Sequence, residues 1–303
     1  MNILITGARG QLGNELRRLL ETGYAEIGAI PAAYEGAQVD YVDFDVLDIS
    51  NAPAVEIWFD EHGPYDIVFN CAAATNVDGC EADEARAYHV NAAGAENLAL
   101  AAASCGAKLV HVSTDYVFPG DVPESRTEDD PVCPVSAYGR TKWAGEVLAQ
   151  AACDRVFIVR TAWLYGYVGK NFVKTMLRLV RESGKISVVA DQMGNPTSAN
   201  DLAYEMLKIA LTDEYGTYHC TNNGTCSWFD FASAIVDGAG VPCEKEPLSS
   251  QEYKRRFPQS ADRPQYSSLC NKRLEATLGD EMRPWQKALA SYLNNLAERG
   301  GTE

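Results

Sequence analysis

The chain has 303 residues, of which 46% are hydrophobic and 22% are charged, so it is long enough to bury a substantial core. Its 26 basic and 42 acidic residues leave a net charge of −16, which opposes binding to nucleic acid or to anionic membranes. No apolar run reaches the length that crosses a bilayer, and residues 1–10 lack the pattern of a signal peptide.

Short apolar strands and longer helices alternate along the first half of the chain. Strands are predicted at 1–7, 25–30, 39–48 (with a loop), 65–73, 108–118 and 154–166, and helices at 11–23, 51–63, 81–106 and 136–152. Continuous apolar strands separated by helices indicate βαβ units, so we expect an α/β fold with a doubly wound parallel sheet.

The pattern changes after residue 166. Helices are predicted at 171–184, 200–211 and about 284–299, with a short strand and turn at 186–198 and a strand at 216–222. We therefore expect a dinucleotide-binding domain over 1–165 and a smaller substrate domain formed mainly by 166–303, although the chain can cross back into the first domain. A cleft is expected between the two.

A glycine-rich turn follows the first strand and opens the first helix, as Gly7-x-x-Gly10-x-x-Gly13. Such glycines permit a tight turn and close approach of backbone to a pyrophosphate, which the helix N-terminus attracts. The predicted strand 25–30 ends at Pro31 without a carboxylate for a ribose, and no arginine stands nearby for a 2′-phosphate. The choice between NADPH and NADH stays open.

Tyr138 and Lys142 are four residues apart in a predicted helix, which places both on one face. A cation within hydrogen-bonding distance lowers the pKa of a phenol by roughly 1–3 units, which suits a proton donor. An exposed helix start with an incidental tyrosine is the competing interpretation.

The nine cysteines are scattered without a C-x-x-C pair, and the four histidines show no metal-ligand spacing. We therefore expect reduced thiols, no metal site and a cytoplasmic protein.

The order of motifs GxxGxxG, NCAAAT (70–75), STD (113–115) and YxxxK resembles the extended short-chain dehydrogenases. The stretches GARGQLG, AAATNVDGCE, STDYVFPG, RTAWLYG, DQMGNPTS and RPQYSSL extend this resemblance over nearly the whole chain, to the dTDP-4-dehydrorhamnose reductases. The resemblance implies a Rossmann-like fold and reduction of the C4 keto group of dTDP-4-dehydro-L-rhamnose to dTDP-L-rhamnose by NADPH or NADH.

The resemblance also implies roles for particular residues. The implied catalytic residues are Tyr138, Lys142 and Thr114. The implied cofactor contacts are Gly7, Gly10, Gln11, Leu12, Gly13, Asp48, Ile49, Ala72, Ala73, Thr75, Tyr138 and Lys142. The implied substrate contacts are Thr114, Asp115, Trp163, Asn171, Lys174 and Arg263. Asn91 matches a helix asparagine of the superfamily, or is a structural cap or kink residue.

Some relatives form homodimers bridged by magnesium through surface glutamates. Glu15 matches one such position, but Asn200 stands where another carboxylate is expected, which makes a bridging magnesium doubtful. We expect a monomer, or a homodimer formed in another way.

Two other functions stay open. One is a sugar-nucleotide epimerase or 4,6-dehydratase of the same fold, although a dehydratase needs an acidic pair beside the threonine and here Tyr116 follows Thr114-Asp115. The other is a non-catalytic regulatory subunit similar to the β subunit of methionine adenosyltransferase, against which the complete Thr114, Tyr138 and Lys142 set argues.

Overall fold

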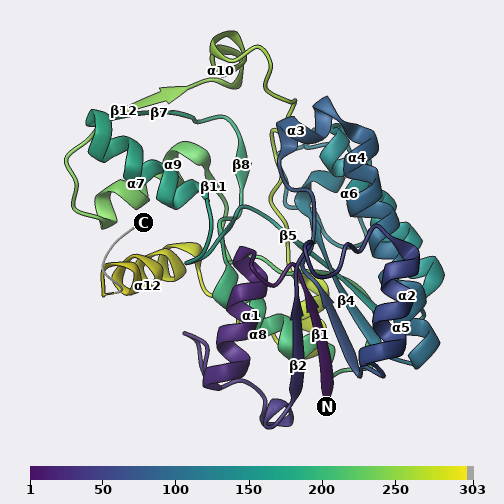
Figure 1. Ribbon diagram of the computed structural model, residues 1–303. Helices are drawn as coiled ribbons and strands as arrows, with labels where there is room; N and C mark the ends of the chain where they lie inside the picture. Colours follow the sequence, from purple (N-terminus) through teal and green to yellow (C-terminus); the bar gives the residue numbers. More distant parts are fainter. Residues whose placement is uncertain (299–303) are drawn as a thin grey trace.

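The computed structural model describes residues 1–298, in which a six-stranded sheet carries helices on both faces and a smaller region lies beside it (Figure 1). The strands of the sheet are β1 (Asn2–Thr6), β2 (Gln38–Val42), β3 (Ile67–Asn70), β4 (Lys108–Thr114), β5 (Val156–Thr161) and β10 (Gly216–His219). They are all parallel, in the order β10-β5-β4-β3-β1-β2. The predicted doubly wound parallel sheet is confirmed.

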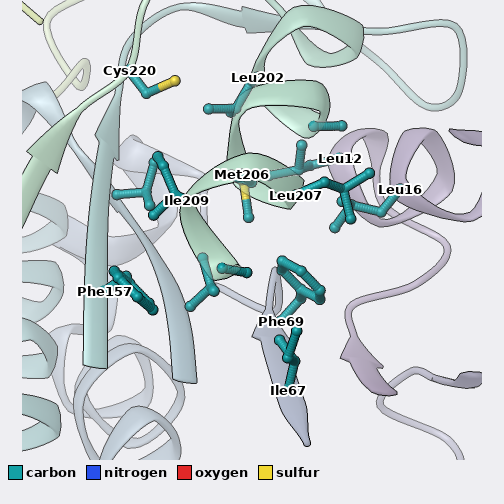
Figure 2. Packing of buried hydrophobic residues seen from close by; sticks show 14 of the residues in the cluster. Leu12, Leu16, Ile67, Phe69, Phe157, Leu202, Met206, Leu207, Ile209 and Cys220 are labelled. Carbon is teal, nitrogen blue, oxygen red and sulfur yellow. The ribbon is translucent and has the colours of Figure 1, made fainter. Parts of the chain in front are cut away.

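Alternate residues of the strands face two separate hydrophobic layers, because successive side chains in a strand point to opposite faces. One face is covered by α1 (Gln11–Thr22), α8 (Ala199–Ala210) and α11 (Lys272–Leu278), and the other by α2 (Ala52–His62), α5 (Gly94–Cys105) and α6 (Ala137–Ala152). Figure 2 shows the first layer, where Leu12 and Leu16 of α1 and Met206 and Leu207 of α8 lie over Phe69 of β3.

Two predicted elements are wrong. Residues 25–30 form a turn rather than a strand, since Gly28 and Pro31 interrupt the segment, and the second strand is β2. The single helix predicted over 81–106 is divided into α3 (Val77–Ala82), α4 (Glu84–Tyr88), a π-helical segment (His89–Ala93) and α5. Asp83 causes the first break, because its side chain accepts the Arg86 N–H and caps a new helix.

The smaller region contains most of the later elements. They are β6 (Leu164–Tyr165), α7 (Phe172–Ser183), β7 (Lys185–Val189), β8 (Met193–Gly194), β9 (Thr197–Ser198), β11 (Cys226–Ser227), α9 (Trp228–Gly238), β12 (Glu244–Leu248), α10 (Ser250–Arg256) and α12 (Trp285–Glu298). Its core combines aliphatic side chains with the aromatic Tyr165, Phe231, Trp285 and Tyr292, packed between α7, α9 and α12. The predicted last helix matches α12, and Arg299 lies outside the described residues.

The chain returns to the main sheet between these elements, since α8 packs on α1 and β10 pairs with β5. The division of function at residue 165 stays a prediction. Within residues 1–298 no helix combines the length and apolarity that a membrane span requires.

Candidate active site

The glycine turn follows β1, which is next to β3 in the sheet. The segments that follow these two strands cover opposite faces of the sheet. Gly7 has φ +64°, and a Cβ on it would lie 2.7 Å from the backbone nitrogen of Ala72, so only glycine fits. Gly10 precedes α1 at the N-cap position, and no side chain of residues 1–298 caps that helix start. The first-turn N–H groups of α1 and the close backbone therefore suit a pyrophosphate, which is the fit a dinucleotide requires.

A carboxylate does follow the second strand, contrary to the prediction drawn from residues 25–30. Asp43 comes directly after β2, and its Oδ2 accepts the backbone N–H of Arg9 in the glycine turn at 3.0 Å. The Arg9 guanidinium forms an ion pair with Asp45 and lies 3.7 Å from Asp43. Asp43 thus occupies the place where such folds bind the adenosine ribose, and the predicted lack of an arginine there is also wrong.

Other predicted cofactor residues surround this turn, with different side-chain contacts. Asp48 Oδ1 accepts the Ser50 N–H at 3.0 Å, which holds the turn before α2, and Ile49 is buried. The Leu12 side chain is in the core, so only its backbone can face a ligand. Residues 72–75, which hold the predicted contacts Ala72, Ala73 and Thr75, form the loop after β3.

The predicted catalytic residues meet between β4 and α6. Thr114 ends β4, and Tyr138 is the second residue of α6, which Ser136 caps by accepting the Gly139 N–H. A Cβ on Gly139 would lie 2.2 Å from the Tyr116 carbonyl oxygen, so this glycine lets the helix reach the loop after β4. The pKa of Tyr138 is raised by burial, and its hydrogen bond with Thr114 acts in the opposite direction.

Lys142 is 2% exposed and points from α6 toward β4. Its Nζ donates to the Val112 carbonyl oxygen at 2.6 Å and lies 3.4 Å from His111 Nε2. Burial lowers the pKa of Lys142 to about 8. The predicted lowering of the Tyr138 pKa by this ammonium is wrong for this structure, because burial of the phenol raises that pKa.

Asp115 is the buried carboxyl beside this set. Thr114 Oγ1 donates to its Oδ1 at 2.9 Å, while Oδ2 has no hydrogen-bond partner among the described residues. Burial raises the pKa of Asp115 to about 7, and the nearby Ser267 and Thr114 hydroxyls act in the opposite direction. A buried carboxyl oxygen without a partner is costly unless a hydroxyl or N–H reaches it, so Asp115 suits a sugar hydroxyl.

A buried ion pair below the catalytic residues was not predicted from the sequence. Arg160 of β5 and Glu146 of α6 approach to 2.6 Å, and Ser113 donates to the same carboxylate at 2.5 Å. Glu146 is one helical turn from Lys142, and this i, i+4 spacing was the signal that the sequence offered. The pair fixes α6 to β4 and β5 beneath the site.

The predicted aromatic contact, Trp163, lies at the edge of the smaller region. It has φ +46°, in the region that favours glycine, and its indole stacks on Trp228 with ring centroids 3.5 Å apart and an interplanar angle of 10°. The structure therefore places Trp163 against another aromatic side chain from α9.

The remaining predicted substrate residues are held by other parts of the protein. Asn171 caps α7, and its Nδ2 donates to Gln11 Oε1 at 3.0 Å and to the Gly166 carbonyl at 2.8 Å. Lys174 Nζ donates to the Tyr167 carbonyl at 2.9 Å. Gln11 and Asn171 thus join the glycine turn to the smaller region.

Two further predicted positions have structural partners. Arg263 lies 3.7 Å from Asp78, on the loop side of α3. Asn91 accepts the Ala74 N–H at 2.8 Å and donates to Thr141 Oγ1 at 3.1 Å, inside the π-helical segment. It therefore ties the loop after β3 to α6, which supports the kink interpretation.

The residues considered for a bridging metal face inward. Glu15 is 1% exposed and accepts hydrogen bonds from Arg18 at 3.0 Å and from Asn200 at 2.9 Å. Within residues 1–298 no group of three or more His, Cys, Asp or Glu residues is arranged to hold a metal ion.

The parallel sheet, the glycine turn at its switch point and the Thr114, Tyr138 and Lys142 set define a Rossmann-fold protein of the extended short-chain dehydrogenase type. A family model described as "RmlD substrate binding domain" matches residues 1–298. The chain belongs to that family, and the resemblance seen in the motifs is confirmed.

Two solved structures and one further relative are similar to this chain over nearly its whole length. A dTDP-4-dehydrorhamnose reductase from Clostridium acetobutylicum has a TM-score of 0.90 and 46% identity, covering 98% of this chain and 100% of that one. The Bacillus anthracis dTDP-4-dehydrorhamnose reductase, solved in complex with NADP, has a TM-score of 0.88 and 41% identity, covering 97% and 99%. A dTDP-4-dehydrorhamnose reductase of Mycobacterium tuberculosis is 40% identical over 298 residues, 96% of this chain and 92% of that protein.

Proposed function

We propose that this chain reduces the C4 keto group of dTDP-4-dehydro-L-rhamnose to dTDP-L-rhamnose with NADPH or NADH. The observation that carries the proposal is that Tyr138 and Lys142 of α6 both face β4, whose last residue is Thr114, and that β3 alone separates β4 from the strand before the glycine turn. Membership of the family and the NADP complex of the Bacillus anthracis relative support it.

The cofactor, when bound, supplies the hydride. The residues that would hold it are the glycine turn and the α1 N-terminus for the pyrophosphate, Asp43 for the adenosine ribose, and Lys142 for the nicotinamide ribose. Tyr138 then donates its phenolic proton to the carbonyl oxygen as that oxygen gains negative charge. The Thr114 hydroxyl, whose proton points to Asp115 in the free protein, turns that proton to the same oxygen and orients it.

The sugar nucleotide is proposed to bind between the sheet and the smaller region. Asp115 Oδ2 accepts a hydroxyl of the sugar, because it is buried and has no partner within residues 1–298. Trp163 lies at the rim of this space, where its stacking on Trp228 fixes the indole plane. Arg263, on the loop beyond α10, is the proposed contact for the nucleotide diphosphate.

We further propose that the enzyme works in the cytoplasm as a monomer or a homodimer without a bridging metal. All nine cysteines lie within the described residues and are free thiols, which suits a reducing compartment. Glu15 is held in an internal contact with Asn200, which leaves it unsuited to a metal between subunits.

Neither alternative has an observation in its favour. A 4,6-dehydratase would need an acidic pair beside Thr114, and here Asp115 is followed by Tyr116, which contacts Tyr138 edge-on with centroids 5.7 Å apart. A regulatory subunit would not need Thr114 and Tyr138 in hydrogen-bonding contact.

The test is to mix the purified protein with the keto-sugar nucleotide and NADPH or NADH, and to follow loss of reduced cofactor by absorbance. Stoichiometric formation of dTDP-L-rhamnose is expected. Cofactor binding without any turnover would contradict the proposal, and NAD that stays bound through purification would favour an epimerase.

A further inference from the structure

A row of three buried polar side chains crosses the centre of the sheet directly behind Lys142. Thr6 of β1, Asn70 of β3 and His111 of β4 are register partners on adjacent strands, and each is 1% exposed. Thr6 Oγ1 donates to Asn70 Oδ1 at 2.8 Å, and Asn70 Nδ2 lies 3.0 Å from His111 Nδ1. Polar groups in a sheet interior are rare, so this row needs an explanation.

The backbone fixes which way the Asn70 amide points. Ala72 N–H donates to Asn70 Oδ1 at 3.2 Å, and an N–H can only donate. The atom that accepts from Ala72 and Thr6 is therefore the amide oxygen, and the atom that faces His111 is the NH₂ group, which can only donate. His111 Nδ1 must accept that hydrogen bond.

This hydrogen bond selects one form of the imidazole. Burial and the nearby Lys142 charge hold the pKa of His111 well below its usual value, so the ring is neutral and carries one proton. Because Nδ1 accepts from Asn70, the proton is on Nε2, which lies 3.4 Å from Lys142 Nζ. The ammonium of Lys142 thus faces an N–H rather than a lone pair.

Two donors that face each other repel, whereas a neutral amine could accept from the same N–H. We propose that His111, held as the Nε2–H tautomer by Asn70, is a positioning residue that weakens the hold of Lys142 on its proton. Lys142 is then a group that gains and loses a proton during turnover, rather than a permanently charged contact. The kinetic consequence of this inference rests on the proposed reductase function. The tautomer of His111 rests on the hydrogen-bond geometry.

The other groups around Lys142 differ in whether they favour its charged or its neutral form. Glu146, one turn along α6, favours the ammonium, but its carboxylate is shared with Arg160 and Ser113. Cys71, after β3, also favours the charged form, and burial disfavours it most strongly. Tyr138 lies one turn before Lys142 on α6 and its proton is the one delivered to the substrate. β4 presents two groups to Lys142, the His111 imidazole and the Val112 carbonyl oxygen, which accepts from Nζ at 2.6 Å and can accept equally from an ammonium or an amine.

The tautomer can be observed without any substrate. Nitrogen-15 NMR distinguishes Nδ1–H from Nε2–H imidazoles, and the chain has only His62, His89, His111 and His219, so loss of a signal in His111→Gln assigns it. We expect the Nε2–H tautomer in the full-length protein. In Asn70→Asp a carboxylate replaces the NH₂ donor, and the tautomer should change to Nδ1–H. A wild-type Nδ1–H signal or an imidazolium would overturn the proposal.

The kinetic consequence is tested by the pH profile of kcat/KM. In His111→Gln the side-chain amide can turn its oxygen toward Lys142, so the basic limb, where the ammonium is lost, should move up by about 1 pH unit. Thr6→Val is the matched control, since it removes a buried hydrogen bond of the same row without changing the group that faces His111. Its basic limb should stay at the wild-type pH, whatever its absolute rate.

The outcomes separate the two proposals. If the keto-sugar is not reduced, the pH dependence of NADPH affinity can be measured instead in wild type and in His111→Gln. It reports the pH at which the Lys142 ammonium is lost without any need for the sugar substrate. Circular dichroism confirms that each variant is folded. An unmoved transition in folded His111→Gln would overturn the role of His111 even when reductase activity is present.

Discussion

The site has two halves, one formed by the main sheet and α6 (the sheet half) and one formed with the smaller region (the sugar side). They differ in whether their buried polar groups have hydrogen-bond partners within the protein. Around α6, the Lys142, His111 and Glu146 side chains all have partners within the protein, although Arg160 Nη1, in the ion pair with Glu146, has none among residues 1–298. On the sugar side, Asp115 Oδ2 and Arg263 Nε are buried without a hydrogen-bond partner among residues 1–298. The catalytic groups are therefore held in place by the protein, whereas the sugar side presents groups suited to a ligand.

The largest expected effect is the loss of activity when the phenol hydroxyl of Tyr138, which bridges the two halves of the site, is removed. Tyr138→Phe should lower kcat/KM by about 10³-fold, because general acid catalysis contributes roughly 10²–10⁴-fold, while NADPH affinity measured by fluorescence changes little. Tyr34→Phe is the matched control, since Tyr34 is a buried tyrosine that bonds the Leu207 carbonyl away from the site. Turnover of Tyr138→Phe within tenfold of wild type would remove Tyr138 as the acid.

The buried ion pair tests how strongly the sheet half is held. Arg160→Met should lower the free energy of unfolding by about 3 kcal/mol, because it leaves the Glu146 carboxylate buried without its cation. The double variant Arg160→Met with Glu146→Leu should recover most of that loss. Urea denaturation measures both. A single variant that loses less than about 1 kcal/mol would show that the pair contributes little to holding α6.

The ionisation of Asp115 should change the stability of the protein with pH in the direction opposite to that of a well-paired carboxyl. Folding raises its pKa to about 7, above its ordinary 3.8, so folding favours the protonated form. This contribution is fully present below about pH 4 and is lost as the pH rises through about 7. Asp115→Asn should therefore stabilise the protein by about 2 kcal/mol at pH 8 and hardly at pH 4, while raising the KM for the sugar nucleotide.

Thermal unfolding at pH 4 and pH 8 measures this difference. Asp60→Asn, a change at an exposed position of α2, is the control and should shift neither value. A stabilisation of equal size at both pH values would show that the ionisation of Asp115 is not its cause.

The smallest expected effect is on cofactor choice. At the proposed ribose position, Asp43 should repel a 2′-phosphate and Arg9 should attract one. Asp43→Asn should raise the ratio of kcat/KM for NADPH to that for NADH by about fivefold, and Arg9→Ala should lower it. If both variants leave the ratio unchanged, the two residues do not face the 2′ position.

Local motifs could be predicted from the sequence because neighbours along the chain determine them. The glycine spacing at residues 7–13 and the interval from Tyr138 to Lys142 each lie within a single turn or helix. Asp43 was missed because two short segments, 25–30 and 39–42, both resembled strands. Only pairing with β1 decided between them.

Gln11 and Asn171 show the same limit in the site. Both were predicted as ligand contacts, yet each uses its side-chain amide to bond the other across 160 positions of sequence. The resemblance to a family indicates which positions matter, but the partner of an amide depends on which segments pack together.

The sequence by itself determined the doubly wound fold, the dinucleotide turn and the helical spacing of the catalytic pair, because these follow from hydrophobic periodicity, glycine and helix geometry. Only the tertiary structure decided that Thr6, Asn70 and His111 form one row behind Lys142. Each comes from a different strand, and parallel register brings together side chains whose order along the chain contains no sign of their contact.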